Sequence, residues 1–244
     1  MFLCLDVGNT GVSWGLFDGH KMRGGGNCRN DAEVESLIPG LPRTLDGVIA
    51  ATVAPARAGH IFSAIEKEIN LKPQLAGQDF PIPVENLTLV ADQVGHDRLL
   101  GALGAFMRTK KATIVADAGT AITINYVDAK CRFRGGVIMP GATTGARALH
   151  RYTEALPRVQ VEKPREMIGR DTEEAIRSGL YWGMIGAVEG MINRFRRTAG
   201  DAEVIFTGGD GNWIAAELGK ADSYVPYLTL EGLYVAYEQS RHMP

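Results

Sequence analysis

The chain is short of the residues that mark several common protein classes. Its 244 residues include only three cysteines, Cys4, Cys28 and Cys131, which lie far apart in the sequence. No two of them have the spacing of a metal site or a redox pair, and an odd number fits no disulfide framework. The sequence therefore predicts free thiols and an intracellular protein.

An excess of charge of one sign is also lacking. The 26 Lys and Arg residues nearly balance the 28 Asp and Glu residues, which gives a net charge of −2. Dedicated nucleic-acid-binding proteins carry a basic excess, so we expect no nucleic-acid partner. No apolar stretch approaches the length of about 20 residues that is needed to span a bilayer. The N-terminal apolar run reaches Asp6 almost at once and lacks the features of a signal peptide. We therefore expect a cytoplasmic protein without membrane contact.

Two common nucleotide-binding signatures are missing. No Gly-Lys pair is followed by Ser or Thr, which excludes a Walker loop, and no Gly-x-Gly-x-x-Gly opens a helix after a strand. Glycine itself is abundant: its 30 residues gather in short clusters between apolar runs, a pattern typical of tight loops.

The apolar runs and turn residues predict an alternation of strands and helices. Residues 1–5 and 12–17 are typical of strands, Asp18-Gly19 of a hairpin turn, and the glycines of 24–27 of a loop. We expect helices at 31–38 (capped by Asn30 or Asp31), 57–69, 99–107 and 228–237, with one long helix or two consecutive helices at 171–197. We expect further strands at 47–53, 112–116, 121–127, 134–139 and 202–207.

One arrangement occurs twice. An apolar strand, an Asp-x-Gly-x-Thr loop, a second strand and a turn appear near the start, around Asp6, and again in the middle, around Asp117. Two copies of one unit predict two similar lobes, 1–111 and 112–244. A cleft between two lobes is a natural ligand site.

These loops suit phosphate binding. Gly8 and Gly119 let backbone N–H groups approach an anion, and the hydroxyls of Thr10 and Thr120 can donate as well. The carboxylate of Asp6 repels phosphate, so its partner is a cation such as Mg²⁺, which binds carboxylates and phosphates together. Asp-Gly and Gly-Asn pairs are also ordinary turn residues, but two copies that each follow an apolar strand favour the phosphate interpretation.

Gly95-His96-Asp97-Arg98 opens a predicted helix. Asp97 is either an acid that is favourable at a helix start or a general base that takes a hydroxyl proton during attack on a γ-phosphate. Arg98 can neutralise charge or hold a substrate carboxylate. Position alone leaves both interpretations open.

Taken together, the motifs resemble the type III pantothenate kinases, a family of the acetate/sugar kinase, heat-shock chaperone and actin superfamily. The resemblance covers nearly the whole chain. It rests on segments 6–10, 52–55, 95–98, 117–121, 135–141, 148–157, 172–179, 207–209 and 228–233. It implies an α/β fold of two similar ribonuclease H-like (actin-like ATPase) lobes with a cleft between them.

The resemblance also implies a reaction. The γ-phosphate of ATP would pass to the primary hydroxyl of pantothenate, the first step of coenzyme A synthesis, with Asp97 as proton acceptor. The residues implied to bind ATP are Asp6, Val7, Gly8, Asn9, Thr10, Gly11, Val12, Ser13, Thr120, Gly208 and Gly209. Those implied to bind pantothenate are Thr88, Gly95, His96, Asp97, Arg98 and Thr172, the last across a homodimer interface.

Two cations are implied as cofactors. Mg²⁺ would accompany ATP and be held through water by Asp6, and a monovalent cation, K⁺ or NH₄⁺, would bind at Asp117. The segment 88–94 departs from the family pattern because it has neither the usual aromatic residue nor the usual proline. His96 replaces a small residue.

Two other functions fit the same fold. A nucleotide-binding regulatory protein, such as a transcription accessory factor, would need neither Asp97 nor Asp117, so their presence favours catalysis. A phosphatase or phosphorylase of the superfamily would use water in place of the alcohol. The Gly-x-Asp-Arg loop argues against it through the resemblance.

Overall fold

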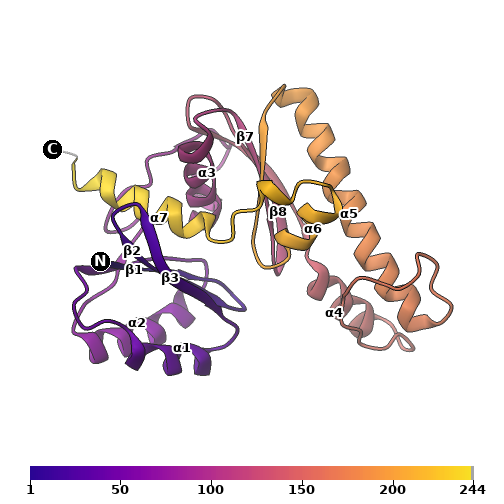
Figure 1. Ribbon diagram of the computed structural model, residues 1–244, viewed down its shortest axis with the longest axis horizontal. Coiled ribbons are helices and arrows are strands. Elements are labelled where there is room, and N and C mark those ends of the chain that lie inside the picture. The colour runs from indigo at the N-terminus through magenta and orange to yellow at the C-terminus, as the bar shows by residue number, and fades with distance from the viewer. Residues whose placement is uncertain (243–244) are drawn as a thin grey trace. The chain divides into compact units, whose positions relative to one another are not determined.

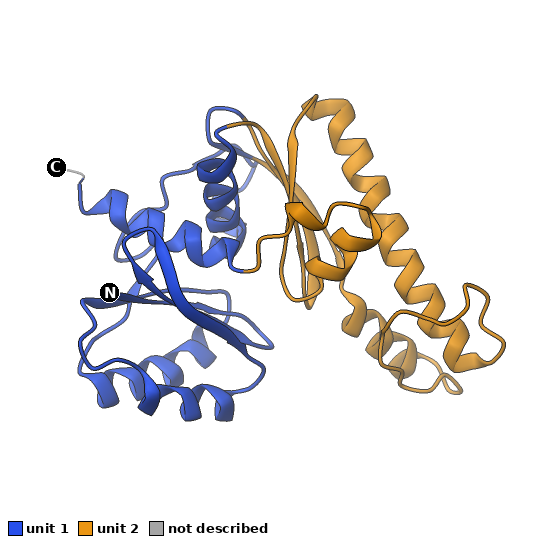
Figure 2. Ribbon diagram, viewed as in Figure 1, with its two compact units in different colours: residues 1–110, 129–133, 227–244 blue, residues 111–128, 134–226 orange. Residues whose placement is uncertain are grey.

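The computed structural model describes residues 1–242 and consists of two compact units (Figure 1 and Figure 2). Unit 1 comprises Met1–Lys110, Ala129–Phe133 and the C-terminal segment from Tyr227. Unit 2 comprises Lys111–Asp128 and Arg134–Pro226. The division near residue 110 lies next to the predicted one, but the C-terminal segment, which the sequence grouped with the second lobe, lies in unit 1.

Unit 1 contains a five-stranded sheet of order β3-β2-β1-β4-β5. Its strands are β1 (Phe2–Val7), β2 (Val12–Asp18), β3 (Lys21–Cys28), β4 (Gly47–Thr52) and β5 (Gln74–Leu75). Its longer helices are α1 (Asp31–Leu37), α2 (Pro55–Ile69), α3 (His96–Thr109) and α7 (Leu228–Ser240). The hairpin strands β1 and β2 are antiparallel, whereas β4 runs parallel to β1. Two short 3₁₀ turns, Ile38–Gly40 and Ala91–Gln93, also lie in unit 1, and a third, Ala221–Ser223, lies in unit 2.

Both faces of this sheet are covered, because successive side chains of a strand point to opposite faces. Leu3 and Leu5 of β1 pack in one buried cluster with residues of α1 and α2. Phe2 and Cys4 pack in a second cluster with residues of α3 and α7. Burial on both sides explains why the sequence of β1 is apolar almost throughout.

Helices α3 and α7 approach each other closely through glycine. A Cβ on Gly104 would lie 2.5 Å from the Leu228 carbonyl oxygen, and one on Gly232 would lie 1.9 Å from that of Leu100. Neither position has room for a side chain. This contact binds the C-terminal helix to unit 1 and explains the grouping of residues from Tyr227 onward.

Unit 2 holds the neighbouring strands β10-β7-β8-β9 of the second sheet. They are β7 (Thr113–Ala118), β8 (Ala121–Val127), β9 (Arg132–Pro140) and β10 (Glu203–Thr207), and the helices are α4 (Ala142–Tyr152), α5 (Thr172–Ala199) and α6 (Gly211–Glu217). The short strand β6 (Glu85–Asn86) pairs with the first two residues of β9, Arg132 and Phe133, which belong to unit 1. Buried residues of α5 and α6 cover the face that carries Ile114 and Ala116.

The predicted internal repeat is confirmed by the strand pairing. In each copy an antiparallel hairpin (β1–β2 or β7–β8) lies beside a parallel strand (β4 or β10). Asp6 is paired with Ser13 and Asp117 with Thr123, so each aspartate stands one residue before the end of its strand. The predicted α/β class is confirmed as well.

One predicted loop is a strand. Residues 24–27, expected as a loop from their three glycines, lie within β3. A Cβ on Gly25 would lie 2.6 Å from the Trp14 carbonyl oxygen, and one on Gly26 would lie 3.0 Å from the Trp14 ring nitrogen. The glycines therefore make room for the Trp14 backbone and ring of the neighbouring strand.

Two helix predictions gain detail. Asn30, one of two expected caps, accepts a hydrogen bond from Glu33 N–H at 2.9 Å and is the cap of α1. The long segment at 171–197 is a single helix, α5, of 28 residues. The short elements α4, α6, β5 and β6 were not predicted.

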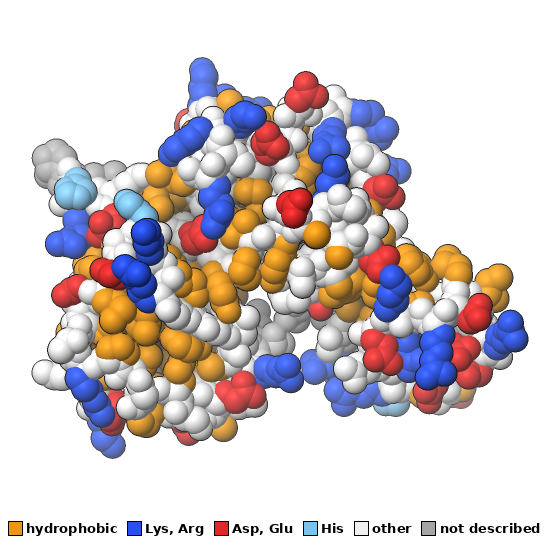
Figure 3. Space-filling model, in the orientation of Figure 1, with side chains coloured by type: hydrophobic (Ala, Val, Ile, Leu, Met, Phe, Trp, Pro, Cys, Tyr) orange, Lys and Arg blue, Asp and Glu red, His pale blue; other side chains and the backbone are white. Residues whose placement is uncertain are grey.

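The surface of the described residues shows no concentration of one charge on the face drawn in Figure 3, where Lys and Arg side chains lie among Asp and Glu side chains. Of the helices within residues 1–242, none has both the length and the apolar character needed to cross a membrane.

Candidate active site

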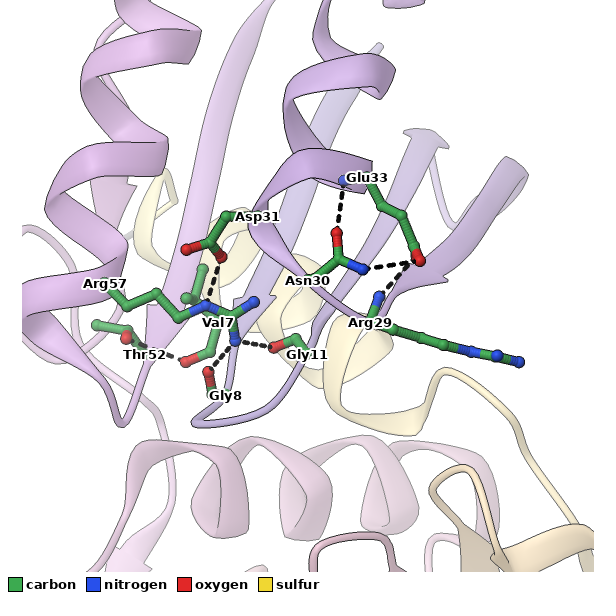
Figure 4. A network of polar contacts seen from close by, with 9 residues as sticks. All are labelled: Val7, Gly8, Gly11, Arg29, Asn30, Asp31, Glu33, Thr52 and Arg57. Carbon is green, nitrogen blue, oxygen red and sulfur yellow. Dashed lines mark hydrogen bonds and ion pairs between the residues drawn. The ribbon is translucent and has the colours of Figure 1, made fainter.

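The first predicted phosphate loop joins β1 to β2 at the carboxyl end of β1 (Figure 4). Gly8 N–H donates to the Gly11 carbonyl oxygen at 3.0 Å, which closes the turn. A Cβ on Gly11 would lie 2.9 Å from the Cys28 carbonyl oxygen, so this position requires glycine. Asn9 and Thr10 at the tip are exposed. The turn therefore presents the two residues that the sequence assigned to phosphate.

Arg57 holds the loop from the first turn of α2. Its Nη1 donates to the carbonyl oxygens of Gly8 at 2.7 Å and Gly11 at 3.2 Å, and its Nε donates to the Asp31 carboxylate at 2.7 Å. Thr52 assists from the end of β4, because its hydroxyl donates to the Val7 carbonyl oxygen at 3.1 Å. Arg57 is not among the predicted site residues, because it offers no local signal beyond being a cation near a helix start.

Three of the residues assigned to ATP have side chains engaged elsewhere. Val7 and Val12 belong to the buried core of unit 1, so only their backbone can reach a ligand. The Ser13 hydroxyl donates to Asn27 on β3 at 2.7 Å.

Asp6 and Asp97 come to the same face and edge of the first sheet. Strand alternation places Asp6 on the face of Phe2 and Cys4, which α3 covers. Helix α3 begins at His96, and a Cβ on Gly95 would lie 3.5 Å from the Val53 side chain, just beyond the end of β4. Since β1 and β4 are parallel, their carboxyl ends meet at the edge where α3 starts.

The carboxylate of Asp97 lies in the first turn of α3, half-buried. Its Oδ1 accepts a hydrogen bond from Arg98 N–H at 2.9 Å. Burial raises the pKa of Asp97, and the Arg98 N–H and the Arg98 charge oppose that rise. A carboxylate with a raised pKa is a stronger proton acceptor than one in water, as general-base catalysis requires.

His96 borders a cavity of about 360 Å³ within unit 1. The cavity is lined by Thr52, Pro55, Ala58, Gly59, Phe62, Leu75, Ala76, Gln78 and His96. The His96 ring packs against Gly77, which has a φ of +78° and whose Cβ would lie 2.4 Å from the ring. The position next to Asp97 therefore borders a space that a small molecule could occupy.

The other predicted pantothenate residues of unit 1 lie in distinct settings. The Arg98 guanidinium lies over the Phe133 ring at 5.3 Å, and burial lowers its pKa. Thr88 donates its hydroxyl to Asn86 at 2.8 Å. Next to Thr88, Leu89 is fully exposed, in the segment that departs from the family pattern.

The second phosphate loop is built from three segments of unit 2. Asp117 lies on the sheet face opposite Ile114 and Ala116, away from α5 and α6. The Thr120 carbonyl oxygen accepts hydrogen bonds from Gly141 N–H at 3.1 Å and the Thr144 hydroxyl at 2.6 Å. Asp210 N–H donates to the Ala118 carbonyl oxygen at 2.9 Å. The predicted motifs around residues 117, 141 and 208 are thus brought together.

Gly208 and Gly209 differ in how tightly they fit this loop. Gly208 has a φ of +82°, and a Cβ there would lie 2.4 Å from both Asp117 Oδ1 and the Ala118 carbonyl oxygen. Gly209 has open space around it. Nearby, burial raises the pKa of Asp210, and a hydrogen bond from the Trp213 ring nitrogen opposes the rise.

Thr172 is the first residue of α5 and is exposed. The preceding Asp171 caps the helix by accepting a hydrogen bond from Glu174 N–H at 2.8 Å. Thr172 belongs to unit 2, whereas Asp97 belongs to unit 1.

The acidic residues of the described chain are better suited to share a cation with waters and a bound phosphate than to hold one with side chains alone. Within residues 1–242 no group of three or more His, Cys, Asp or Glu side chains could hold a metal ion. Mg²⁺ commonly binds through one or two carboxylates, waters and substrate phosphates, which is compatible with a single carboxylate at Asp6.

Comparison with known proteins identifies the family. The sequence profile described as type III pantothenate kinase matches residues 2–194. The type III pantothenate kinase of Exiguobacterium sibiricum is 31% identical over 253 residues, covering 99% of this chain and 100% of the relative. That of Syntrophotalea carbinolica is 33% identical over 254 residues, with the same coverage. A solved structure from Campylobacter jejuni, described as a Baf family transcriptional activator, has the same fold, with a TM-score of 0.64, 19% identity and coverage of 99% of this chain and 100% of that one. On the strength of the profile and the full-length relatives, this chain belongs to the type III pantothenate kinase family.

Proposed function

We infer that this protein transfers the γ-phosphate of ATP to the primary hydroxyl of pantothenate and forms 4′-phosphopantothenate, the first step of coenzyme A biosynthesis. Family membership supplies the reaction. The observation that supports catalysis by this chain is the half-buried Asp97. It lies in the first turn of α3, at the same edge of the sheet as the Asp6 loop, and burial raises its pKa.

Asp97 acts as the general base. Its carboxylate takes the proton from the hydroxyl of pantothenate as that oxygen forms a bond to the γ-phosphorus, while the bond to the bridging oxygen breaks and ADP leaves. Arg98 holds the substrate carboxylate, and His96 and Gly95 line the acceptor site. Thr88 contacts the acceptor as well.

The loop of Asp6 to Ser13 binds the phosphates of ATP. Backbone N–H groups of a glycine-containing turn and the Thr10 hydroxyl are suited to anionic oxygens. Asp6 orients Mg²⁺ through water. When it is bound with ATP, Mg²⁺ neutralises charge on the β- and γ-phosphates.

Residues of unit 2 are assigned to ATP as well. Thr120 contacts a phosphate, and Gly208 and Gly209 provide a surface without side chains for the nucleotide. Asp117 binds a monovalent cation, K⁺ or NH₄⁺. The support for this assignment is the convergence of the three segments around Asp117 within unit 2.

The active form is a homodimer in which Thr172 reaches the pantothenate of the partner subunit. Unit 2 has apolar side chains that an interface could bury: Tyr152 is 81% exposed, Met167 66% and Ile168 80%. Light scattering of the purified protein measures its mass directly, and a monomer at working concentration would contradict this part of the proposal. The cytoplasmic location remains a prediction from the sequence.

One assay tests the reaction. Purified protein with ATP, Mg²⁺ and K⁺ should release ADP only when pantothenate is added, and Asp97→Asn should abolish this release. Turnover without pantothenate would contradict the proposed acceptor. Nucleotide binding without any turnover would favour the regulatory alternative. Omission of K⁺, compared with the same omission in Asp117→Asn, tests the cation assignment, because the variant should have lost the dependence on K⁺.

A further inference from the structure

Arg57 connects three separate segments of unit 1 (Figure 4). The residue follows Pro55 and Ala56 in the first turn of α2, and its side chain is only 16% exposed. One edge of its guanidinium meets the two carbonyl oxygens of the phosphate loop, and Nε meets Asp31 at the start of α1. The planar fork of arginine suits such a multiple contact, which lysine cannot reproduce.

The partner carboxylate is itself fixed in place. Asp31 is the first residue of α1, and Asn30 caps that helix through Glu33 N–H. The Glu33 carboxylate reaches back to Arg29 N–H at 2.8 Å and to the Asn30 amide at 3.1 Å. This reciprocal capping, shown in Figure 4, holds the start of α1 and therefore the anchor of Arg57.

The contact sets the direction of the loop amides. In a trans peptide the C=O and the following N–H point in opposite directions. With the Gly8 carbonyl oxygen turned toward Arg57, the N–H of Asn9 points away from the guanidinium, at the exposed tip of the loop. An arginine that faces the carbonyls thus orients an amide donor toward the side where an anion can bind.

We propose that Arg57 is a positioning residue for nucleotide binding, which fixes the phosphate loop so that the Asn9 N–H faces the ATP phosphates. This inference rests on the proposed function, since it takes the loop to be the ATP site. Arg57 acts through the two carbonyl groups and need not touch the nucleotide.

The test compares two arginines of unit 1. Arg43 also donates to a backbone carbonyl oxygen, that of Glu68, at 2.6 Å and to the Glu68 carboxylate at 2.6 Å. Neither of these bonds involves a residue of the phosphate loop. Arg43→Ala therefore removes the same kinds of bond as Arg57→Ala and serves as the matched control. The readout is the Kd of a non-hydrolysable ATP analogue with Mg²⁺, measured by calorimetry.

Arg57→Ala should weaken analogue binding about tenfold or more, because hydrogen bonds made by a charged group are lost. Guanidinium ion at millimolar concentration should restore part of the affinity, since it can fill the space of the deleted side chain. Arg43→Ala should bind the analogue as the unmodified protein does. Unchanged binding by Arg57→Ala, or equal weakening by Arg43→Ala, would overturn the proposal.

Arg57→Lys keeps the test decisive where the alanine variant does not fold. Lysine retains the charge but cannot reach both carbonyls and Asp31 together, so a folded Arg57→Lys should also bind the analogue more weakly. Wild-type affinity in this variant would refute the positioning role. An unmodified protein that binds the analogue but does not phosphorylate pantothenate would contradict the proposed function and leave the result on Arg57 intact.

Discussion

The carboxylate of Asp117 lies against Gly208, so closely that a Cβ on residue 208 would come within 2.4 Å of Asp117 Oδ1. Asp117 lies one residue before the end of β7, and Gly208 directly follows β10. These two strands are parallel neighbours in which Asp117 pairs with Thr207. Tyr224 adds a restraint, since its hydroxyl donates to the Gly208 carbonyl oxygen at 3.2 Å. The Asp117 carboxylate can therefore occupy this position only because residue 208 has no side chain.

Gly208→Ala should destabilise the protein and impair turnover. The positive φ of 82° is unfavourable for alanine, and its methyl group would displace Asp117 or the Ala118 carbonyl. We expect a loss of about 2 kcal/mol or more, which lowers Tm by roughly 4–8 °C. Calorimetry and ADP release measure the two effects.

Gly209→Ala is the control for this change. It adds the same methyl group to the next residue, where no atom lies within 4 Å. Its Tm should stay within about 2 °C of the unmodified protein. Equal destabilisation by both variants would show that the loop responds to any side chain and not to crowding of Asp117.

Asp97→Asn should abolish turnover and yet stabilise the fold at neutral pH. Burial raises the pKa of Asp97 above 3.8, so the folded protein holds this proton more tightly than the unfolded chain. Stability is therefore lost as the pH rises from 3.8 through the folded-state pKa, and the ionised carboxylate carries a cost above that range. Asparagine does not ionise and avoids the cost.

The measurement is Tm as a function of pH for both proteins. Above the folded-state pKa of Asp97 the variant should melt higher, by roughly 2–4 °C for each kcal/mol gained. Below pH 3.8 the gain should vanish, because the carboxyl group is then protonated in both states of the unmodified protein. A variant that melts lower than the unmodified protein at neutral pH contradicts the assigned sign.

Gly95→Ala should reduce turnover with little loss of stability. A Cβ on Gly95 would lie 2.4 Å from Asp97 Oδ1, while the next atoms are 3.5 Å away. The Asp97 carboxylate can rotate away, so the fold is spared, but the base is then misplaced. We expect kcat to fall about tenfold or more, with Tm changed by about 2 °C at most. Unchanged kcat would argue against Asp97 as the base.

Gly232→Ala should destabilise the protein through the contact between α3 and α7. The added methyl group would lie 1.9 Å from the Leu100 carbonyl oxygen, and a backbone atom cannot rotate away. The helices must separate, at a cost of about 1–3 kcal/mol or more. Gly101→Ala is the matched control in α3, because its nearest new contact is 3.8 Å away at the Thr229 hydroxyl. Helix propensity makes that change neutral or stabilising, and denaturant unfolding compares the two.

Strand alternation and the repeat made much of the fold predictable. An apolar run followed by Asp-x-Gly-x-Thr is local information, and it correctly placed the hairpin of β1 and β2 and its copy in β7 and β8. The prediction failed at 24–27, because two of the three glycines of β3, Gly25 and Gly26, lie against the backbone and side chain of Trp14 on another strand. Local composition carries no record of such a contact.

In the candidate active site, likewise, residues in local motifs could be predicted, whereas a residue defined by contacts between distant segments could not. The sequence by itself determined the carboxylates Asp6, Asp97 and Asp117 as the candidates, since each sits in a short motif whose chemistry is visible in the residues themselves. It did not identify Arg57, because the atoms that give this side chain a role belong to Gly8, Gly11 and Asp31, far from it in the chain.

The sequence thus fixes which groups can react, because residue type and turn chemistry are local properties. Only the tertiary structure decides how they are held: Gly208 against Asp117, Gly95 against Asp97, and Arg57 behind the phosphate loop. These relationships depend on distances between segments that the chain brings together only when its sheets pair and its helices pack. The contact between Arg57 and the carbonyls of the loop is the one that local residue patterns offered least reason to expect.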